Sequence, residues 1–267
     1  MRALYLGDIV GRRAREAVQA ALPDLRRTLA LDFVVLNGEN AAGGFGITGE
    51  IAEALFAAGA DCIVTGNHVW DQREIIPYFQ RETRLLRPLN FPASAPGRGL
   101  GRFELPDGRR AIVLQAMGRV FMEPLDDPFA AADQALADLT LGRDAAFILA
   151  DIHAEATSEK MAFGHHLDGR VSAVVGTHSH VPTADLRFLP GGTAYQTDIG
   201  MCGDYDSVIG MDKAEALQRF RHKVPGGRMS PALGEPTLCG TLFETDDATG
   251  LCRQARAFRQ GGCLPAG

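Results

Sequence analysis

Apolar runs of strand length alternate with longer amphipathic stretches in the first third of the chain. The runs with the character of buried strands are Arg2–Leu6, Phe33–Leu36 and Cys62–Thr65. Between them, Arg13–Leu29 carries alanine and leucine at helical spacing, with a break or restart near Pro23. Thr48 is a suitable N-cap for a second helix that ends at Ala58. Strands alternating with helices predict consecutive βαβ units and a parallel sheet, as in the α/β class.

The pattern changes after Pro88. Two strand-like runs, Gly101–Leu105 and Arg110–Gln115, flank Pro106–Arg109, whose Asp-Gly pair is typical of a hairpin turn. An antiparallel pair beside parallel units predicts a mixed sheet. Further strands are expected at Ala145–Ile152, Ala173–Thr177, Thr193–Ile199, Cys239–Thr245 and Gln254–Arg259. Further helices are expected at Val69–Tyr78, Phe129–Leu141, Ser158–Leu167 and Asp212–His222.

The composition fits one folded domain. With 267 residues, 46% of them apolar, the chain can bury a substantial core. No repeat or linker-like shift divides it, so a single domain over residues 1–267 is expected. Pro/Gly clusters at Pro96–Gly99 and Pro225–Arg228 predict exposed turns. The 5 cysteines are scattered without a C-x-x-C spacing, which predicts ordinary thiols. Cys202 follows a strand-end segment, which is compatible with a place near the site but gives it no role there.

Charge and hydropathy limit the classes of partner. A net charge of -6 and a pI near 5.6 argue against non-specific nucleic-acid binding, which needs clustered lysine and arginine. The first apolar run, Met1–Leu6, is much too short for a signal peptide or a membrane-spanning helix. A cytoplasmic protein without membrane attachment is therefore expected. A homo-oligomer is compatible with this length, but no heptad or interface stripe identifies one.

Polar side chains with the chemistry of metal ligands follow several predicted strands. They lie in the strand-end segments Gly7–Asp8, Asn37–Asn40, Gly66–His68, Asp151–His153 and Thr177–His180. Loops converge at the carboxyl ends of strands in an α/β sheet, so these segments are expected to form one site. Carboxylate, amide and imidazole together suit hard or borderline divalent ions. The sequence therefore predicts a metal-dependent hydrolase.

Each of these side chains also has a purely structural interpretation. A turn, a helix cap or a core hydrogen bond accounts equally well for any one of Asp8, Glu39–Asn40, Asn67 and His153. The pair His178 and His180 is more specific, because alternate residues of an extended segment point the same way and can face one ion or two adjacent ions. The repetition of the pattern at separate strand ends favours the metal site.

These segments resemble the calcineurin-like metallophosphoesterases and, among them, the bacterial YmdB-type phosphodiesterases associated with 2',3'-cyclic nucleotides. The matching segments are Gly7–Gly11, Asn37–Ala42, Thr65–His68, His153–Lys160 and Asp168–His180. Gly-Asn-His with a later His-x-His is specific to the superfamily, and Asn-Gly-Glu-Asn with His-Ala-Glu-Ala-Thr-Ser-Glu-Lys is specific to the subgroup. The resemblance covers nearly the whole chain. It implies a four-layer α/β/β/α sandwich with mixed sheets and a site at the C-terminal ends of the strands.

Two departures from the superfamily pattern fall within the site. Val10 stands where the superfamily has the histidine of Asp-x-His, and Gly38–Asn40 replaces Gly-Asp-x-x-Asp. The subgroup shares both changes, which implies a variant site that is still active. His165 and His166 also differ from relatives, and we interpret them as the solvated end of a helix.

The resemblance also implies a ligand set. A first metal is held by Asp8, Glu39, Asn40 and His180, and a second by Glu39, Asn67, His153 and His178, with Glu39 bridging. Two divalent or mixed-valence ions about 3.5 to 4 Å apart lower the pKa of a shared water and stabilise both the entering and the leaving oxygen at phosphorus. Neutral imidazole and amide ligands leave positive charge that attracts a phosphodiester anion. Iron or manganese is favoured, and zinc is compatible.

The same resemblance makes His68 the proton donor. In the family, the histidine after this asparagine protonates the leaving oxygen, and Asp71 is close enough in sequence to orient it. The structural alternative is a helix-start histidine packed on Trp70. The resulting hypothesis is a phosphodiesterase that hydrolyses 2',3'-cyclic nucleotides, or related phosphodiesters, by attack of a metal-bridging hydroxide.

Two functions of other classes stay open. Gly7 and Gly11 after the first strand suggest a doubly wound nucleotide-binding module, but G-x-G-x-x-G is missing, and no Walker lysine follows Gly43–Gly46. A regulatory scaffold that binds a phosphorylated ligand or a protein, with incidental hydrolysis, fits the same fold. An intact ligand set argues against a purely structural role but leaves regulation open.

Overall fold

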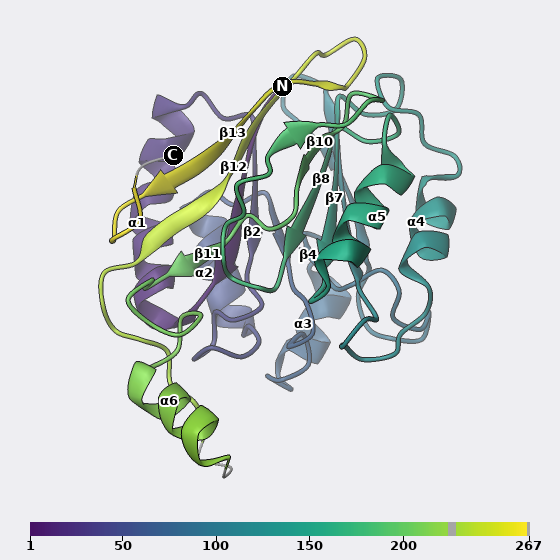
Figure 1. Ribbon diagram of the computed structural model, residues 1–267. Helices are drawn as coiled ribbons and strands as arrows, with labels where there is room; N and C mark the ends of the chain where they lie inside the picture. The colour runs from purple at the N-terminus through teal and green to yellow at the C-terminus, as the bar shows by residue number, and fades with distance from the viewer. Residues whose placement is uncertain (224–227, 266–267) are drawn as a thin grey trace.

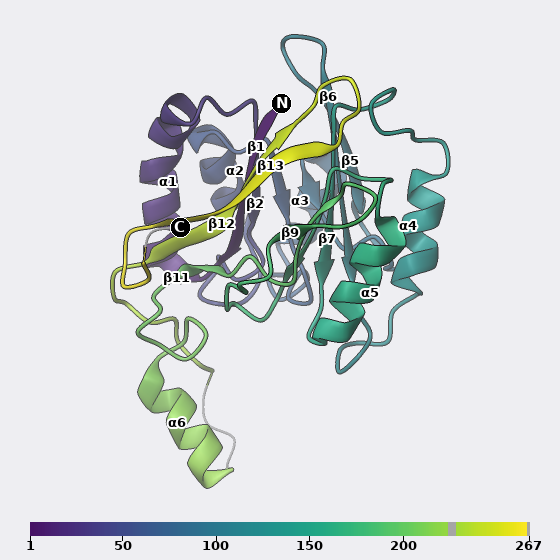
Figure 2. The ribbon, with the colours of Figure 1, turned by 45° about the horizontal axis from the view of Figure 1, so that its top comes forward.

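The computed structural model describes residues 1–223 and 228–265. Of the predicted turn Pro225–Arg228, only Arg228 falls within these residues. Two β-sheets lie face to face, with helices on both outer surfaces (Figure 1, Figure 2). This is the four-layer α/β/β/α arrangement with mixed sheets that the resemblance implied.

The first sheet joins the N-terminal βαβ units to the C-terminal hairpin. Its strands, in spatial order, are β13 (Cys252–Gln260), β12 (Thr237–Thr245), β11 (Met201–Gly203), β1 (Arg2–Ile9), β2 (Phe33–Asn37), β3 (Cys62–Val64) and β4 (Leu85–Leu86). The strands from β11 to β4 run parallel, whereas β12 is antiparallel to β1, β11 and β13. All of the predicted N-terminal strands are therefore present in one sheet.

The second sheet contains the middle of the chain. Its strands, in spatial order, are β5 (Leu100–Glu104), β6 (Arg110–Met117), β7 (Phe147–His153), β8 (Ala173–Thr177), β10 (Ala194–Gln196) and β9 (Arg187–Phe188). The four inner strands are parallel, and the edge strands β5 and β9 are antiparallel to their neighbours. The predicted hairpin is confirmed as β5–β6, and Gly108 takes the positive φ of 84° that its turn requires.

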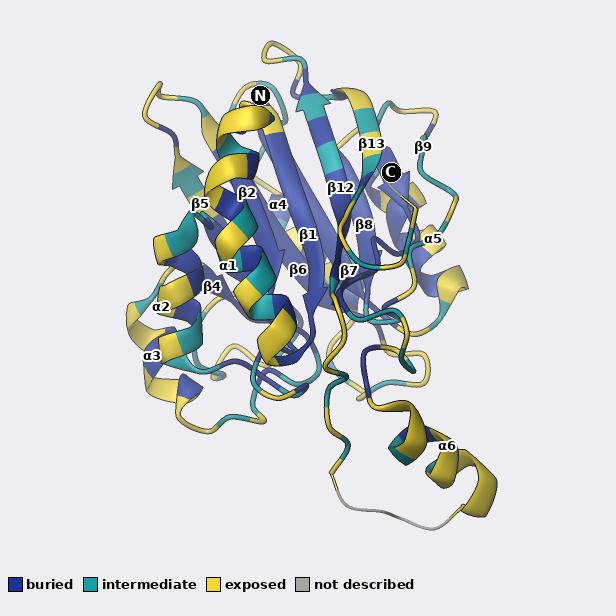
Figure 3. Cartoon of the chain, turned by 90° about the vertical axis from the view of Figure 1, so that its left-hand side faces the viewer, coloured by how far each residue is buried: buried dark blue, intermediate teal, exposed yellow. Residues whose placement is uncertain are grey.

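Helices cover the outer surface of each sheet. The first sheet is covered by α1 (Gly11–Thr28), α2 (Gly49–Ala58) and α3 (Ile75–Arg81), and the second by α4 (Pro128–Leu136) and α5 (Thr157–Leu167). Between the sheets, apolar side chains of facing strands pack together, among them Tyr5, Val35, Val113 and Leu149. Figure 3 shows the strands as the buried centre and the helices as exposed on their outer faces.

Helix α1 corrects one expectation, because it runs without a break through Pro23. Its buried stripe consists of Ala14, Val18, Leu22 and Leu25. A proline inside a helix costs about 3 kcal/mol, whereas burying each large apolar side chain contributes about 1.5 to 3 kcal/mol. Packing against the first sheet therefore outweighs the backbone hydrogen bond lost at Pro23.

Two other helix predictions had wrong boundaries. The helix expected over Val69–Tyr78 begins only at Ile75, because the preceding residues form turns, with Asp71 N–H donating to the carbonyl of His68. The helix expected over Phe129–Leu141 ends at Leu136, where turns lead into β7. In both places local turns replace part of the predicted helix.

The last helix, α6 (Lys213–His222), stands away from the rest of the described chain (Figure 1, Figure 3). Ala216 is its buried residue, and Leu217 and Phe220 are exposed. None of the helices in the described residues combines the length and apolar character needed to cross a membrane.

Candidate metal centre

The predicted site residues lie where parallel strands of both sheets end. Asp8 lies in β1 directly before its last residue, Glu39 and Asn40 follow β2, and Asn67 and His68 follow β3. In the second sheet, His153 is the last residue of β7, and His178 and His180 follow β8. The two sheets thus contribute to the same edge of the sandwich, as the pattern of strand ends predicted.

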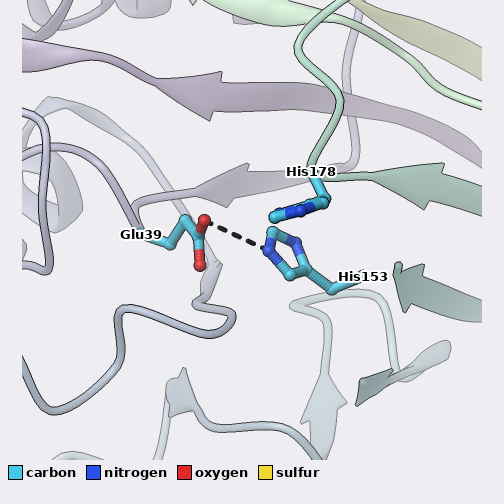
Figure 4. A group of neighbouring side chains, drawn as sticks. All are labelled: Glu39, His153 and His178. Atoms are coloured by element: carbon cyan, nitrogen blue, oxygen red, sulfur yellow. Dashed lines mark ion pairs between the residues drawn. The ribbon is translucent and has the colours of Figure 1, made fainter. Parts of the chain in front are cut away.

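Glu39, His153 and His178 form the closest group (Figure 4). One ligand atom from each lies within 4.8 Å of the others, and His153 Nε2 is 3.1 Å from Glu39 Oε1. The His153 and His178 rings meet edge to face with centroids 4.9 Å apart. Gly66 makes room for this group, because a β-carbon there would overlap both the Glu39 carboxylate and the His153 ring.

The hydrogen bonds of His153 fix which nitrogen is available to a metal. The Thr177 hydroxyl donates to Asp151 Oδ1 at 3.0 Å and therefore accepts from His153 Nδ1, which lies 2.8 Å away. His153 Nε2 then faces Asn67 Oδ1 at 2.9 Å as well as the Glu39 carboxylate. An acceptor nitrogen surrounded by acceptor oxygens needs a proton or a metal ion between them.

His180 repeats this arrangement on the other side of the site. Its Nδ1 donates to the carbonyl of Ile209 at 2.8 Å, so Nε2 carries the lone pair and faces Asn40 Oδ1 at 3.2 Å. The Asn40 amide donates to the carbonyl of Gly44 at 2.9 Å, which fixes its oxygen toward His180. A second pair of facing acceptors therefore also suits a cation.

Asp8 is fully buried and incompletely satisfied. Its Oδ2 accepts from the His178 backbone N–H at 3.3 Å, whereas Oδ1 has no hydrogen-bond partner among the described residues. Burial raises the pKa of this carboxyl above its ordinary value. A buried carboxylate oxygen without a partner is costly, and a bound cation would satisfy it.

The charges in the site are set by burial and by the closeness of Glu39 to His153. Burial opposes charge on both groups, but their attraction outweighs it, so the pKa of Glu39 is lowered and the pKa of His153 is raised. Burial and the nearby charge of His153 lower the pKa of His178 to about 3. His178 is therefore neutral near pH 7, which is the form that binds metals.

The segment from His178 to His180 is not extended, contrary to the expectation. His178 has a φ of 98° and His180 a φ of 65°, which are strained values for residues with a β-carbon. Between them, Ser179 donates its N–H and its hydroxyl to Asp198 Oδ2, at 3.1 and 2.8 Å. The two imidazoles are therefore placed in the site by a turn that Asp198 holds, and not by the alternation of side chains along a strand.

Two buried charges under this turn were missed by sequence reasoning. Lys160 lies in the segment His153–Lys160 that carried the resemblance, and Asp198 lies near the end of the predicted strand Thr193–Ile199, but neither pattern indicated a buried ion pair. Glu155, in the same segment, was also missed as a contact of the site. Its exposed carboxylate lies 3.2 Å from His178 Nε2.

His68 lies at the margin of the group and is half-buried. Its backbone N–H donates to Glu39 Oε2 at 3.3 Å, and its Nδ1 is 3.1 Å from Asp71 Oδ2. The suspected contact with Asp71 is thus present. The alternative packing of His68 on Trp70 is not observed, because Trp70 stacks with Phe79 and Phe91.

The remaining sequence candidates lie outside this group. His166 pairs with Asp133 at 2.9 Å at the end of α5, in keeping with the solvated helix end that was expected. Cys202 is buried in the core beneath the first sheet, and the described cysteines are all free thiols.

The YmdB-like protein family matches residues 4–258 of the chain. The chain belongs to the YmdB-like protein family. A relative from Bacillus subtilis, the 2',3'-cyclic-nucleotide 2'-phosphodiesterase, is 45% identical over 249 residues, which cover 93% of either chain. The resemblance read from the motifs is thereby confirmed.

Solved structures of this family share the fold. A hypothetical protein from Thermus thermophilus superimposes with a TM-score of 0.91 and 41% identity, over 98% of this chain and 100% of that one. A structure described as a novel phosphatase from Mycoplasma pneumoniae superimposes with a TM-score of 0.90 and 32% identity, over 98% of this chain and 93% of that one. These comparisons support a hydrolase of the metallophosphoesterase type.

Proposed function

We propose that this protein is a metal-dependent phosphodiesterase that hydrolyses 2',3'-cyclic nucleotides or related phosphodiesters. The observation that carries the proposal is a pair of imidazoles whose Nδ1 atoms are engaged elsewhere while their Nε2 atoms face amide oxygens. These are His153 with Asn67 and His180 with Asn40. Such acceptor pairs suit cations. The name of the Bacillus subtilis relative supports the class of substrate.

The proposed centre holds two metal ions. The first is assigned to Asp8, Glu39, Asn40 and His180, and the second to Glu39, Asn67, His153 and His178. The oxygen of Asp8 that has no hydrogen-bond partner among the described residues and the contact of Glu39 with His153 support cation binding by these groups. When bound, the ions, with iron or manganese favoured, would lower the pKa of water and neutralise charge that develops at phosphorus.

His68 is proposed to protonate the leaving oxygen of the ribose. Asp71 accepts a hydrogen bond from the N–H at His68 Nδ1. The proton transferred to the leaving oxygen is then the one on Nε2. The Asp71 carboxylate also sets the orientation of the His68 ring. His68 is therefore a catalytic residue in this proposal, and Asp71 is a positioning residue.

Removal and return of the metal tests the proposal. The purified protein is stripped with a chelator and reloaded with Mn²⁺ or Fe²⁺, and hydrolysis of 2',3'-cyclic AMP is followed. We expect turnover to disappear on stripping and to return on reloading. Turnover that persists after complete removal of metal would overturn the proposal. Two bound metals without turnover on any phosphodiester would instead support the regulatory scaffold.

The role of His68 is tested separately. Replacing it with alanine (His68→Ala) is expected to lower kcat by about 10²- to 10⁴-fold, the usual contribution of a general acid, while the metal content is retained. The matched control is His165→Ala, an exposed histidine at the end of α5. Unchanged turnover in the His68 variant would remove this residue from the mechanism.

A further inference from the structure

Phe45 contacts both His68 and an exposed arginine at the margin of the site. The Phe45 and His68 rings meet nearly at a right angle, 86°, with centroids 5.1 Å apart. The Arg228 guanidinium carbon lies over the Phe45 ring at 4.7 Å from its centroid. The Phe45 ring is therefore a shared contact of His68 and Arg228.

The Phe45 ring is held in place by its loop. The carbonyl of Phe45 accepts from the Gln72 side chain at 2.8 Å, and the neighbouring carbonyl of Gly44 accepts from Asn40, a proposed metal ligand. One side of the ring packs near Val10 and Met211 in a small buried cluster. Phe45 is thus fixed relative to the proposed metals and supports the arginine above it.

Arg228 has a charge that no neighbour neutralises within the described part of the chain. It is exposed and forms no ion pair among those residues, and its guanidinium rests on the Phe45 ring. Elsewhere arginines of this protein meet carboxylates, as Arg109 does with Asp32 at 2.7 Å. A planar cation resting on an aromatic ring and open to solvent is a surface on which a nucleobase can stack.

We propose that Arg228, supported by Phe45, binds the base of the nucleotide. The inference rests on the proposed function, in which His68 faces the leaving oxygen. In a 2',3'-cyclic nucleotide that oxygen belongs to the ribose that carries the base, so the nucleoside lies on the His68 side of phosphorus. The Phe45 ring contacts His68, and the Arg228 guanidinium lies over the same ring. This pair therefore determines preference for nucleotides over other cyclic phosphodiesters.

The inference is tested with two substrates, one with a base and one without. One is 2',3'-cyclic AMP, and the other is methyl riboside 2,3-cyclic phosphate, which has a methyl group in place of the base. For Arg228→Ala we expect KM for 2',3'-cyclic AMP to rise about tenfold, in line with the usual strength of base stacking, with kcat little changed. Both parameters for the substrate without a base should stay at the wild-type values.

Further variants identify the chemistry of the contact. Arg228→Lys keeps the positive charge but removes the planar guanidinium, so its KM for 2',3'-cyclic AMP is expected to be raised as in Arg228→Ala. The matched control, Arg221→Ala, removes an exposed arginine of α6 and should leave kcat and KM unchanged for both substrates. Equal losses on both substrates, an unchanged KM for 2',3'-cyclic AMP, or full recovery by lysine would each overturn the inference while leaving the proposed function intact. If wild-type protein turned over neither substrate, the proposed function would fail, and this inference with it.

Discussion

The Lys160 ammonium lies 2.8 Å from Asp198 Oδ2, and both side chains are almost completely buried. The same carboxylate oxygen accepts the N–H and the hydroxyl of Ser179, which lies between His178 and His180. The two histidines have positive φ angles, so their turn needs an external hold. The buried ion pair supplies that hold directly beneath the proposed metals.

Replacing the lysine should destabilise the protein strongly. In Lys160→Met, Asp198 is left as an unpaired buried charge, and we expect the free energy of unfolding to fall by about 3 to 5 kcal/mol. Urea denaturation measures this change. The control Lys213→Met removes an exposed ion pair with Asp206 and should cost about 0 to 1 kcal/mol. Adding Asp198→Asn to Lys160→Met should recover part of the loss, and a loss no larger than that of the control would contradict the account.

Thr177 is predicted to control metal affinity through His153. In Thr177→Val the Nδ1–H of His153 loses its acceptor and the ring loses its fixed orientation. Loss of such a partner weakens metal binding by about 10- to 100-fold. Competition with a fluorescent chelator measures the metal Kd. Thr177→Ser retains the hydroxyl and should bind metal normally, so equal affinities in the valine and serine variants would show that this hydrogen bond has no such role.

Gly66 is predicted to be essential for the metal group. A β-carbon in Gly66→Ala would overlap the Glu39 carboxylate and the His153 ring, so we expect metal affinity to fall at least tenfold, by about 1.4 kcal/mol. Metal content by elemental analysis after dialysis checks this. Gly108→Ala is the comparison, because a β-carbon there meets open space; its positive φ of 84° makes the variant less stable, but its turn precedes β6, at the other end of the strands from the site, so metal content should not change. Full metal occupancy in the Gly66 variant would refute the prediction.

Acid stability is predicted to depend on Asp185. Partial burial raises its pKa, but hydrogen bonds from Thr183, Thr197 and Arg187 outweigh burial and leave the pKa below its ordinary value. A carboxyl with a lowered pKa in the folded state adds stability above its unfolded pKa of about 3.9, and this stability is lost as the pH falls through the folded pKa.

The pH dependence of thermal unfolding tests this prediction. Between about pH 5 and pH 2, wild-type protein should lose more stability than Asp185→Asn, because the variant has no carboxylate to protonate there. Scanning calorimetry gives Tm at each pH. Parallel losses in the two proteins would show that Asp185 contributes nothing to the acid transition.

The position of the site was predictable, because it depends on local patterns. Apolar runs ending in Asp8, in Glu39 and Asn40, and in His153 predict strand ends, and parallel strands bring such ends to one edge. Helix boundaries were less predictable. Ile75 begins its helix late because the residues before it bond to the site loops, as Gln72 does with Phe45.

The charges beneath the site were not predictable from the sequence. Lys160 and Asp198 are 38 residues apart, and each has the appearance of a solvent-exposed polar residue in its own segment. Their burial follows from a tertiary contact, in which Lys160 of α5 meets Asp198 in the segment after β10. The positive φ angles of His178 and His180 depend on the same contact and replace the extended geometry that alternation suggested.

The most direct test of the central claim is a count of bound metal together with 2',3'-cyclic AMP hydrolysis, in wild-type protein and in Glu39→Gln. Glu39 lies at the centre of the proposed dinuclear site. The control is Glu53→Gln, the same substitution at an exposed glutamate. The account predicts two metals and metal-dependent turnover in wild type and in the control, with both lost or sharply reduced in Glu39→Gln. No bound metal in active wild-type protein, or unchanged turnover in Glu39→Gln, would contradict it.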